Sequence, residues 1–83
     1  MSGVERLDAL GWALAEMGWR VVIRYGEARL WASPRSALHS GEVVSITSVP
    51  DGLWFWGNAG GLLARGDDLQ GALESLERLL RPA

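Results

Sequence analysis

The sequence predicts an α+β fold in which a four-stranded antiparallel sheet carries two helices on one of its faces. Amphipathic segments stand at both ends of the chain, and between them lie four short β-type runs joined by turns. Hairpins leave no crossover helix for the far side of a sheet, so both helices are expected on the same face, in the order α-β-β-β-β-α. At 83 residues, the chain has the size of one domain, spanning 1–83.

The first helix is predicted to run from Gly3 to Met17. Gly18 follows it and supplies the left-handed conformation that ends many helices. Trp19 is therefore expected to fold back on Leu14 in a Schellman-type contact. The apolar residues that recur at intervals of three and four, and so form the buried stripe, are Val4, Leu7, Leu10, Leu14 and Met17.

Two β-type runs, 20–25 and 28–33, form the clearest hairpin. Gly26 takes the first central position between them, which suits a two-residue type II′ turn. In that register one side of the hairpin is apolar and faces the helices, while the other side carries two directly opposed pairs. These pairs are Val22 with Trp31 and Arg24 with Arg29.

A second hairpin is predicted over 42–57, because Pro50-Asp51-Gly52 forms a turn between two further β-type runs. Two registers are open. With a three-residue loop, which we prefer, Phe55 joins Val43 on the face opposite the helices, and the two tryptophans beside Phe55 face the core. With a two-residue loop the strands shift by one residue, and Phe55 exchanges faces with both tryptophans.

The rest of the chain is predicted to be a flexible connection, 58–66, followed by a second helix. A short additional strand at 62–64 is an open alternative for part of that connection. Asp67, three residues before Gln70, is expected to cap the helix, and Asp68 adds negative charge at its positive end. The buried stripe of this helix is expected to consist of Leu69, Ala72, Leu73, Leu76, Leu79 and Leu80.

Composition and charge exclude several classes of function. The chain has no cysteine and one histidine, which excludes disulfides, thiolate zinc sites and multi-histidine metal sites. The chain has 8 basic residues, all arginine, and 10 acidic residues, so its net charge is −2. Nucleic-acid binders usually carry a surplus of basic residues instead. There is no membrane-span-length apolar run and no signal-peptide charge pattern. We therefore expect a cytoplasmic protein that binds neither nucleic acid directly nor a membrane.

The chain carries no complete catalytic motif. The glycines of 61–66 have the spacing of a phosphate-binding loop, but Asp67 and Asp68 stand where a lysine and a hydroxyl residue are required. His39 and Ser40 are adjacent in sequence, which does not present a nucleophile to its base, so His39 is expected on an exposed loop. The sequence predicts no catalytic residue, no cofactor and no metal site.

Five tryptophans in 83 residues are the strongest feature of the composition. Two helices can cover only one face of the sheet, so the other face is expected to expose large apolar side chains together with arginines, as protein interfaces do. The residues expected to form this interface are Val22, Arg24, Arg29, Trp31, Val43 and Phe55. In the alternative register Trp54 and Trp56 replace Phe55.

Several explanations of this aromatic surface are open. The tryptophans could fill the core or a homodimer interface for stability alone, or the face could bind another protein or single-stranded nucleic acid, the last disfavoured by the charge. We favour a non-enzymatic protein-interaction module, acting as a homodimer or as the accessory partner of a regulatory protein. The alternative is a small-molecule-binding protein with a tryptophan-lined pocket.

Three segments carry a family resemblance: 14–21 (LAEMGWRV), 54–57 (WFWG) and 66–73 (GDDLQGAL). Together they resemble a group of small uncharacterised proteins of high-GC actinomycetes, and the likeness spans nearly the whole chain. Those proteins look like partners or accessories of helix-turn-helix regulators, which implies such a role here but no biochemical activity. The group is richer in tryptophan after the aromatic strand than 58–61 is here, so the connection to the second helix is expected to differ.

Overall fold

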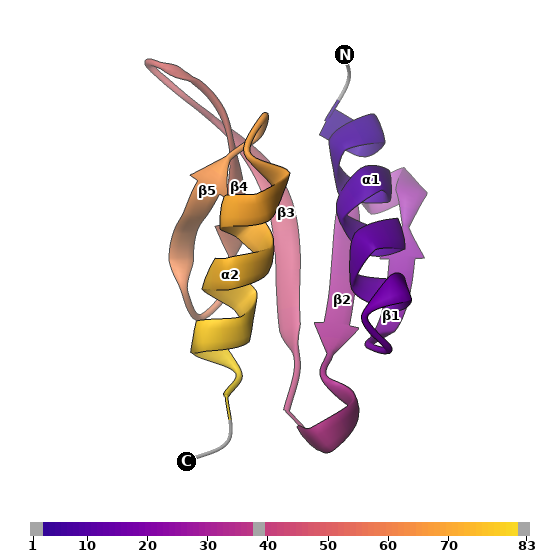
Figure 1. The fold of residues 1–83 in the computed structure, drawn as a ribbon. Coiled ribbons are helices and arrows are strands. Elements are labelled where there is room, and N and C mark those ends of the chain that lie inside the picture. Colours follow the sequence, from indigo (N-terminus) through magenta and orange to yellow (C-terminus); the bar gives the residue numbers. More distant parts are fainter. Residues whose placement is uncertain (1–2, 38–39, 82–83) are drawn as a thin grey trace.

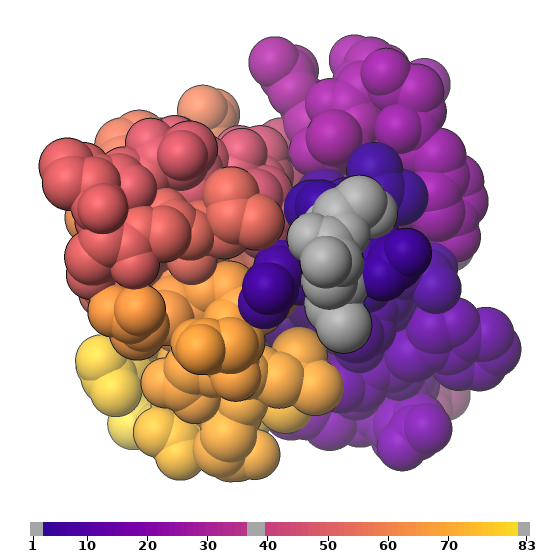
Figure 2. All heavy atoms as spheres, turned by 90° about the horizontal axis from the view of Figure 1, so that it is seen from above, coloured from indigo at the N-terminus to yellow at the C-terminus, as the bar shows by residue number. Residues whose placement is uncertain are grey.

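Five antiparallel strands form one sheet, and both helices lie on the same face of it (Figure 1). This computed structural model describes residues 3–37 and 40–81. The helices are α1 (Gly3–Glu16) and α2 (Leu69–Leu79). The strands lie in the sheet in sequence order and are β1 (Arg20–Arg24), β2 (Arg29–Ser33), β3 (Glu42–Val49), β4 (Gly52–Gly57) and β5 (Gly61–Arg65). Figure 2 looks from the end where both helices begin, and the turns between β1 and β2 and between β3 and β4 lie at this end, on the sheet side of the helices.

The predicted α+β class is confirmed, but the sheet has five strands and not four. β5 lies within 58–66, for which the sequence predicts a flexible connection, and its position agrees with the alternative of an additional strand there. It pairs with β4 around a β-bulge that leaves Leu63 without an opposite residue. Because this extra residue interrupts the two-residue alternation of side chains, β5 lacks the pattern by which strands are recognised. The opposing pairs around the bulge are Phe55 with Ala64 and Trp56 with Leu62.

The predicted end of α1 is confirmed to within one residue. Gly18 adopts a left-handed conformation with φ 87°. The N–H of Trp19 donates to the carbonyl of Leu14 at 3.1 Å, and the N–H of Gly18 donates to that of Ala15 at 3.0 Å, which is the Schellman motif. Met17, assigned by the sequence to the buried stripe, is 43% exposed because it lies past the last helical residue.

The cap of α2 lies one residue later than predicted. Asp68, and not Asp67, accepts a hydrogen bond from the N–H of Gly71, at 2.9 Å. Asp67 instead lies 3.7 Å from Nε of Arg65. Leu79, expected in the buried stripe, is partly exposed because, at the last residue of the helix, it lies over Gly60 in the turn between β4 and β5.

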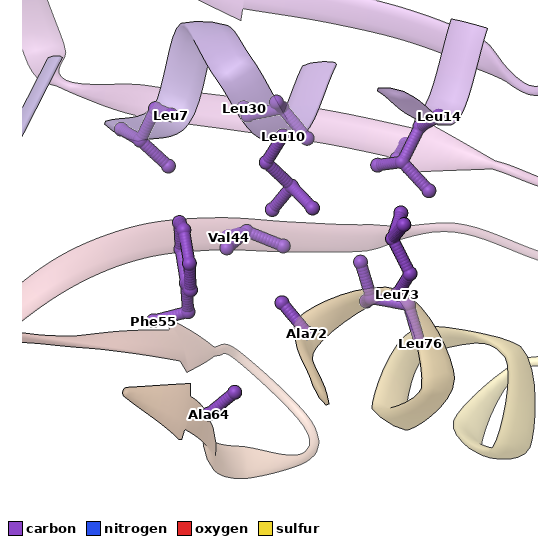
Figure 3. Packing of buried hydrophobic residues seen from close by; sticks show 11 residues of the cluster. Leu7, Leu10, Leu14, Leu30, Val44, Phe55, Ala64, Ala72, Leu73 and Leu76 are labelled. Atoms are coloured by element: carbon purple, nitrogen blue, oxygen red, sulfur yellow. The ribbon is translucent and has the colours of Figure 1, made fainter. Parts of the chain in front are cut away.

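The core lies between the sheet and the two helices. Three leucines of α1 point toward the sheet and α2, and Phe55 rises from β4 to meet them (Figure 3). Burying one such leucine or phenylalanine side chain contributes roughly 1.5–3 kcal/mol. The buried apolar residues are Leu7, Leu10, Leu14, Leu30, Ala32, Val44, Phe55, Ala64, Ala72, Leu73 and Leu76.

The first hairpin has the predicted register but a different turn. Arg24 lies opposite Arg29, and the four residues 25–28 connect them. Ala28, and not Gly26, takes the left-handed conformation, with φ 52°. Its N–H donates to the carbonyl of Tyr25 at 3.2 Å, which closes a single 3-10 turn. The predicted type II′ turn is therefore wrong.

The second hairpin adopts the two-residue register, so the preferred three-residue register is wrong. Val49 lies opposite Gly52, and Ile46 lies opposite Phe55. Phe55 therefore faces the helices and is 1% exposed. Phe55 packs in the core with the buried leucines, whereas the bulkier Trp54 and Trp56, whose indole N–H groups need partners, lie on the other face.

Candidate interaction surface

The face of the sheet opposite the helices, called here the open face, is crossed by rows of directly opposed residues. Residues opposite each other in neighbouring strands share a face, so each row can be followed from strand to strand. The first row is Val22, Trp31 and Val43. The second row is Arg24, Arg29, Ser45, Trp56 and Leu62. The third row is Thr47, Trp54 and Arg65.

The structure places on the open face all the residues predicted for the interface except Phe55. Phe55 lies in the core, because the strands of the second hairpin are shifted by one residue from the preferred register. Trp54 and Trp56 take its place, as the alternative register predicts. Trp56 is 42% exposed and Val22 is 50% exposed, so large apolar side chains of this face contact solvent.

Two shallow hollows lie side by side on the open face. The first, of about 170 Å³, brings together Val22, Arg24, Arg29, Trp31 and Val43, with Glu27 and Leu30 at its border. The second, of about 200 Å³, is lined by Arg29, Val43, Ser45, Trp56 and Asn58. Arg29 and Val43 belong to both hollows, so the two form one continuous surface across β1 to β4.

Trp31 is fixed by the backbone at Gly41. A Cβ atom at position 41 would lie within 2.7 Å of Cε2 of the Trp31 indole, so no side chain fits there. The segment leading into β3 therefore packs directly on the ring. A tryptophan held in this way offers a rigid apolar surface, which is what binding hot spots use.

Arg24 and Arg29 differ from Arg65, another arginine of the open face, in forming no ion pair with a described residue. Arg65 donates through Nη1 to Asp51 Oδ2 at 2.9 Å, and its guanidinium carbon lies 6.0 Å from the centroid of the Trp54 ring. In the part of the chain that the structure describes, neither Arg24 nor Arg29 forms an ion pair. Like charges directly opposite each other destabilise a sheet, so this pair carries a cost in the free protein.

Glu42 is a buried carboxylate that the sequence does not single out. It is 3% exposed, and its Oε2 accepts from the backbone N–H groups of Ala59, at 2.9 Å, and Gly60, at 3.1 Å. Its Oε1 accepts from the N–H of Val43 at 2.9 Å. Since backbone amides hold both oxygens, the carboxylate closes the turn between β4 and β5 and is not free to act on a substrate. The amides of Ala59 and Gly60 lie 17 and 18 residues from Glu42, so no local sequence pattern predicts these two contacts.

Other candidate sites find little support. Within 3–37 and 40–81, no cluster of three or more His, Asp or Glu side chains could hold a metal ion. No helix of the described chain has the length and apolar content needed to cross a membrane. His39, predicted to lie on an exposed loop, falls outside the described residues. The glycines of 61–66 belong to β5 and the turn after it, not to a phosphate-binding loop.

No family model matches the chain, and no curated protein and no solved structure is found to be similar to it.

Proposed function

We propose that this chain is a non-enzymatic protein-interaction module that binds its partner through the open face. The observation that carries the proposal is the pair Arg24 and Arg29, which lie directly opposite each other beside Trp31 and form no ion pair with any described residue. A partner that brings acidic groups to this pair would relieve the repulsion and desolvate the tryptophan at the same time.

On the open face, the size of the hollows favours a protein over a small molecule. They measure about 170 and 200 Å³, below the ~300–1,000 Å³ of pockets that enclose small-molecule ligands. Each suits one inserted side chain of a larger partner. Tryptophan and arginine around an apolar centre are also the residues in which protein interfaces are enriched.

Two kinds of partner are compatible with the sequence: a second copy of the chain and a regulatory protein, the latter implied by the resemblance to the actinomycete group. A two-fold axis through the first hollow would bring Arg24 and Arg29 of both copies together, which like-charge repulsion disfavours. A regulatory protein with an acidic surface meets no such repulsion. We therefore favour the accessory role over the homodimer.

The test is retention of a partner by the tagged protein, combined with its mass by light scattering. We expect a specific protein to be retained by wild type and by Arg78→Glu, a control on the exposed side of α2, but lost with Arg29→Glu. We expect the free chain to be a monomer. Equal retention by Arg29→Glu and Arg78→Glu would contradict the proposal, and a dimer that Arg29→Glu dissociates would support the homodimer instead.

A further inference from the structure

β1 is an edge of the sheet with no neighbour on its outer side among the described residues. It pairs with β2 alone and lies at the right-hand margin of the molecule (Figure 1). Every second residue of such an edge strand turns its N–H and C=O groups outward, where they can pair with another strand. The centre of β1, Val21-Val22-Ile23, is β-branched throughout, which favours an extended partner.

On the helix side, a wide and shallow apolar groove lies along this edge. It has a volume of about 330 Å³ and is lined by α1 above and by β1 beside it, with Trp12, Ala15, Val21 and Ile23 among its walls. Trp12 is 67% exposed, so this large side chain of α1 is not used in the core. At one end the hydroxyl of Tyr25 donates to Asp8 Oδ1 at 2.7 Å and ties the hairpin turn to the helix. The inward side chains of a strand added beside β1 would enter this groove.

On the open face, the same edge presents two arginines on either side of a valine. Arg20, Val22 and Arg24 alternate along β1 with the groove-facing residues, and all three are exposed. Neither arginine forms an ion pair within the described residues. In an added strand, the residues directly opposite these three would therefore be favoured as acidic, apolar and acidic.

The charge also argues against a second copy at this edge. Antiparallel pairing of two β1 strands about Val22 would place Arg20 of each copy opposite Arg24 of the other, so like charges would meet twice. Edge strands commonly avoid self-pairing through charged residues of this kind. Acidic residues of a partner segment would instead be attracted to Arg20 and Arg24.

We propose that β1 binds an extended segment of a partner protein as a sixth strand, with acidic, apolar and acidic residues on the open face and apolar residues in the groove beside Trp12. This inference rests on the proposed function, because the segment would belong to the same partner. It adds the form of the binding element and a second contact surface, continuous with the open face through Val22 and Arg24.

The probe is the capped peptide SELVLES, which carries this alternation. Its matched controls are SKLVLKS and SELVLES methylated on the backbone nitrogens of its Leu-Val-Leu core. We expect SELVLES to protect the amides of Val21 and Ile23, which turn outward from the edge, from hydrogen exchange and to change tryptophan fluorescence. The methylated peptide should not bind, because it keeps every side chain but has lost the N–H donors of an added strand. Arg20→Glu should lower the affinity for SELVLES by roughly five- to tenfold and raise the affinity for SKLVLKS. Trp12→Ser should lower the affinity for both peptides. Trp12 is exposed, so its replacement leaves the core intact.

Two results would overturn the strand proposal: no protection of the Val21 and Ile23 amides at millimolar SELVLES, or equal binding of SELVLES and its backbone-methylated form. Its failure is distinguishable from failure of the proposed function. If the retained partner is lost with Arg29→Glu but kept with Trp12→Ser, the open face binds without the edge. If Trp12→Ser releases it and Arg29→Glu does not, the edge binds without the open face.

Discussion

Phe55 lies directly opposite Ile46 across β3 and β4, and this pairing decides which aromatic residues contact solvent. Because the two strands are joined by the two residues 50–51, Phe55 points under the helices and Trp56 points away from them. A shift of one residue would exchange the two faces along the whole hairpin. The length of this turn therefore decides that Trp54 and Trp56, and not Phe55, lie on the open face.

Phe55→Leu is expected to destabilise the protein by about 1–2 kcal/mol, because it removes ring atoms from a filled core. Trp56→Ser, at an exposed position, is expected to change the free energy of unfolding by no more than about 0.5 kcal/mol. Urea denaturation followed by circular dichroism measures both values. The reverse order of the two effects would mean that the hairpin has the other register.

Gly41→Ala is expected to destabilise the protein by about 1–3 kcal/mol, because the new methyl group would overlap the Trp31 indole. Gly26→Ala provides the matched control, since a Cβ atom there meets nothing within 4 Å and the backbone is not left-handed. It should be neutral or stabilise by up to about 1 kcal/mol. Thermal unfolding of the two variants compares their stabilities directly. An equal loss of stability in both would contradict the close contact between Gly41 and Trp31.

Glu42→Gln is expected to lower the free energy of unfolding by about 1–3 kcal/mol. The amide group cannot accept from all the backbone N–H groups that the carboxylate satisfies, and one of them would be left buried without a partner. Glu74→Gln, on the exposed side of α2, should cost less than about 0.5 kcal/mol. Chemical denaturation of the pair tests this, and a neutral Glu42→Gln would show that the turn between β4 and β5 does not depend on the carboxylate.

The titration of Tyr25 can be measured without overlap from other tyrosines, because Tyr25 is the single tyrosine of the chain. Its hydrogen bond to the Asp8 carboxylate raises the pKa of the phenol, with smaller contributions from desolvation and from the negative charge of Asp8. Asp8→Asn should return this pKa toward its ordinary value, measured by the ultraviolet absorbance of tyrosinate. An unchanged titration in Asp8→Asn would contradict the assigned hydrogen bond.

The sign of the linked stability effect follows from the raised pKa. The contribution of the Tyr25 to Asp8 hydrogen bond is fully present below the pKa of an unfolded tyrosine, near 10, and is lost as the pH rises through the higher folded value. Tyr25→Phe should abolish this part of the alkaline loss of stability. If wild type and Tyr25→Phe lose stability in parallel above pH 10, the contact does not contribute.

The two hairpins explain why the sequence predicts one part of the open face correctly and not the other. For the first hairpin, a two-residue turn and the observed four-residue turn both place Arg24 opposite Arg29, so the wrong turn type leaves the register unchanged. For the second, loops of two and three residues differ by one, which reverses the faces. Turn residues define where that hairpin bends, but the packing of Phe55 under two helices selects its register.

The remaining differences between prediction and structure come from contacts between distant parts of the chain. β5 is stabilised by pairing with β4 around a bulge, and the alternation that would reveal a strand is absent from its five residues. Two of the three amides that Glu42 binds, those of Ala59 and Gly60, are 17 and 18 residues from it. The groove beside β1 likewise requires knowing how α1 crosses the edge of the sheet, which periodicity does not determine.

Oxidative footprinting of the tryptophans, in the free protein and with its retained partner, tests the central claim most directly. The account predicts that Trp56 is oxidised in the free protein and protected in the complex, while Met17, exposed at the end of α1, is oxidised equally in both. Protection of Trp56 in the free monomer, or equal oxidation of Trp56 in both states, would contradict the claim that the open face is the binding surface.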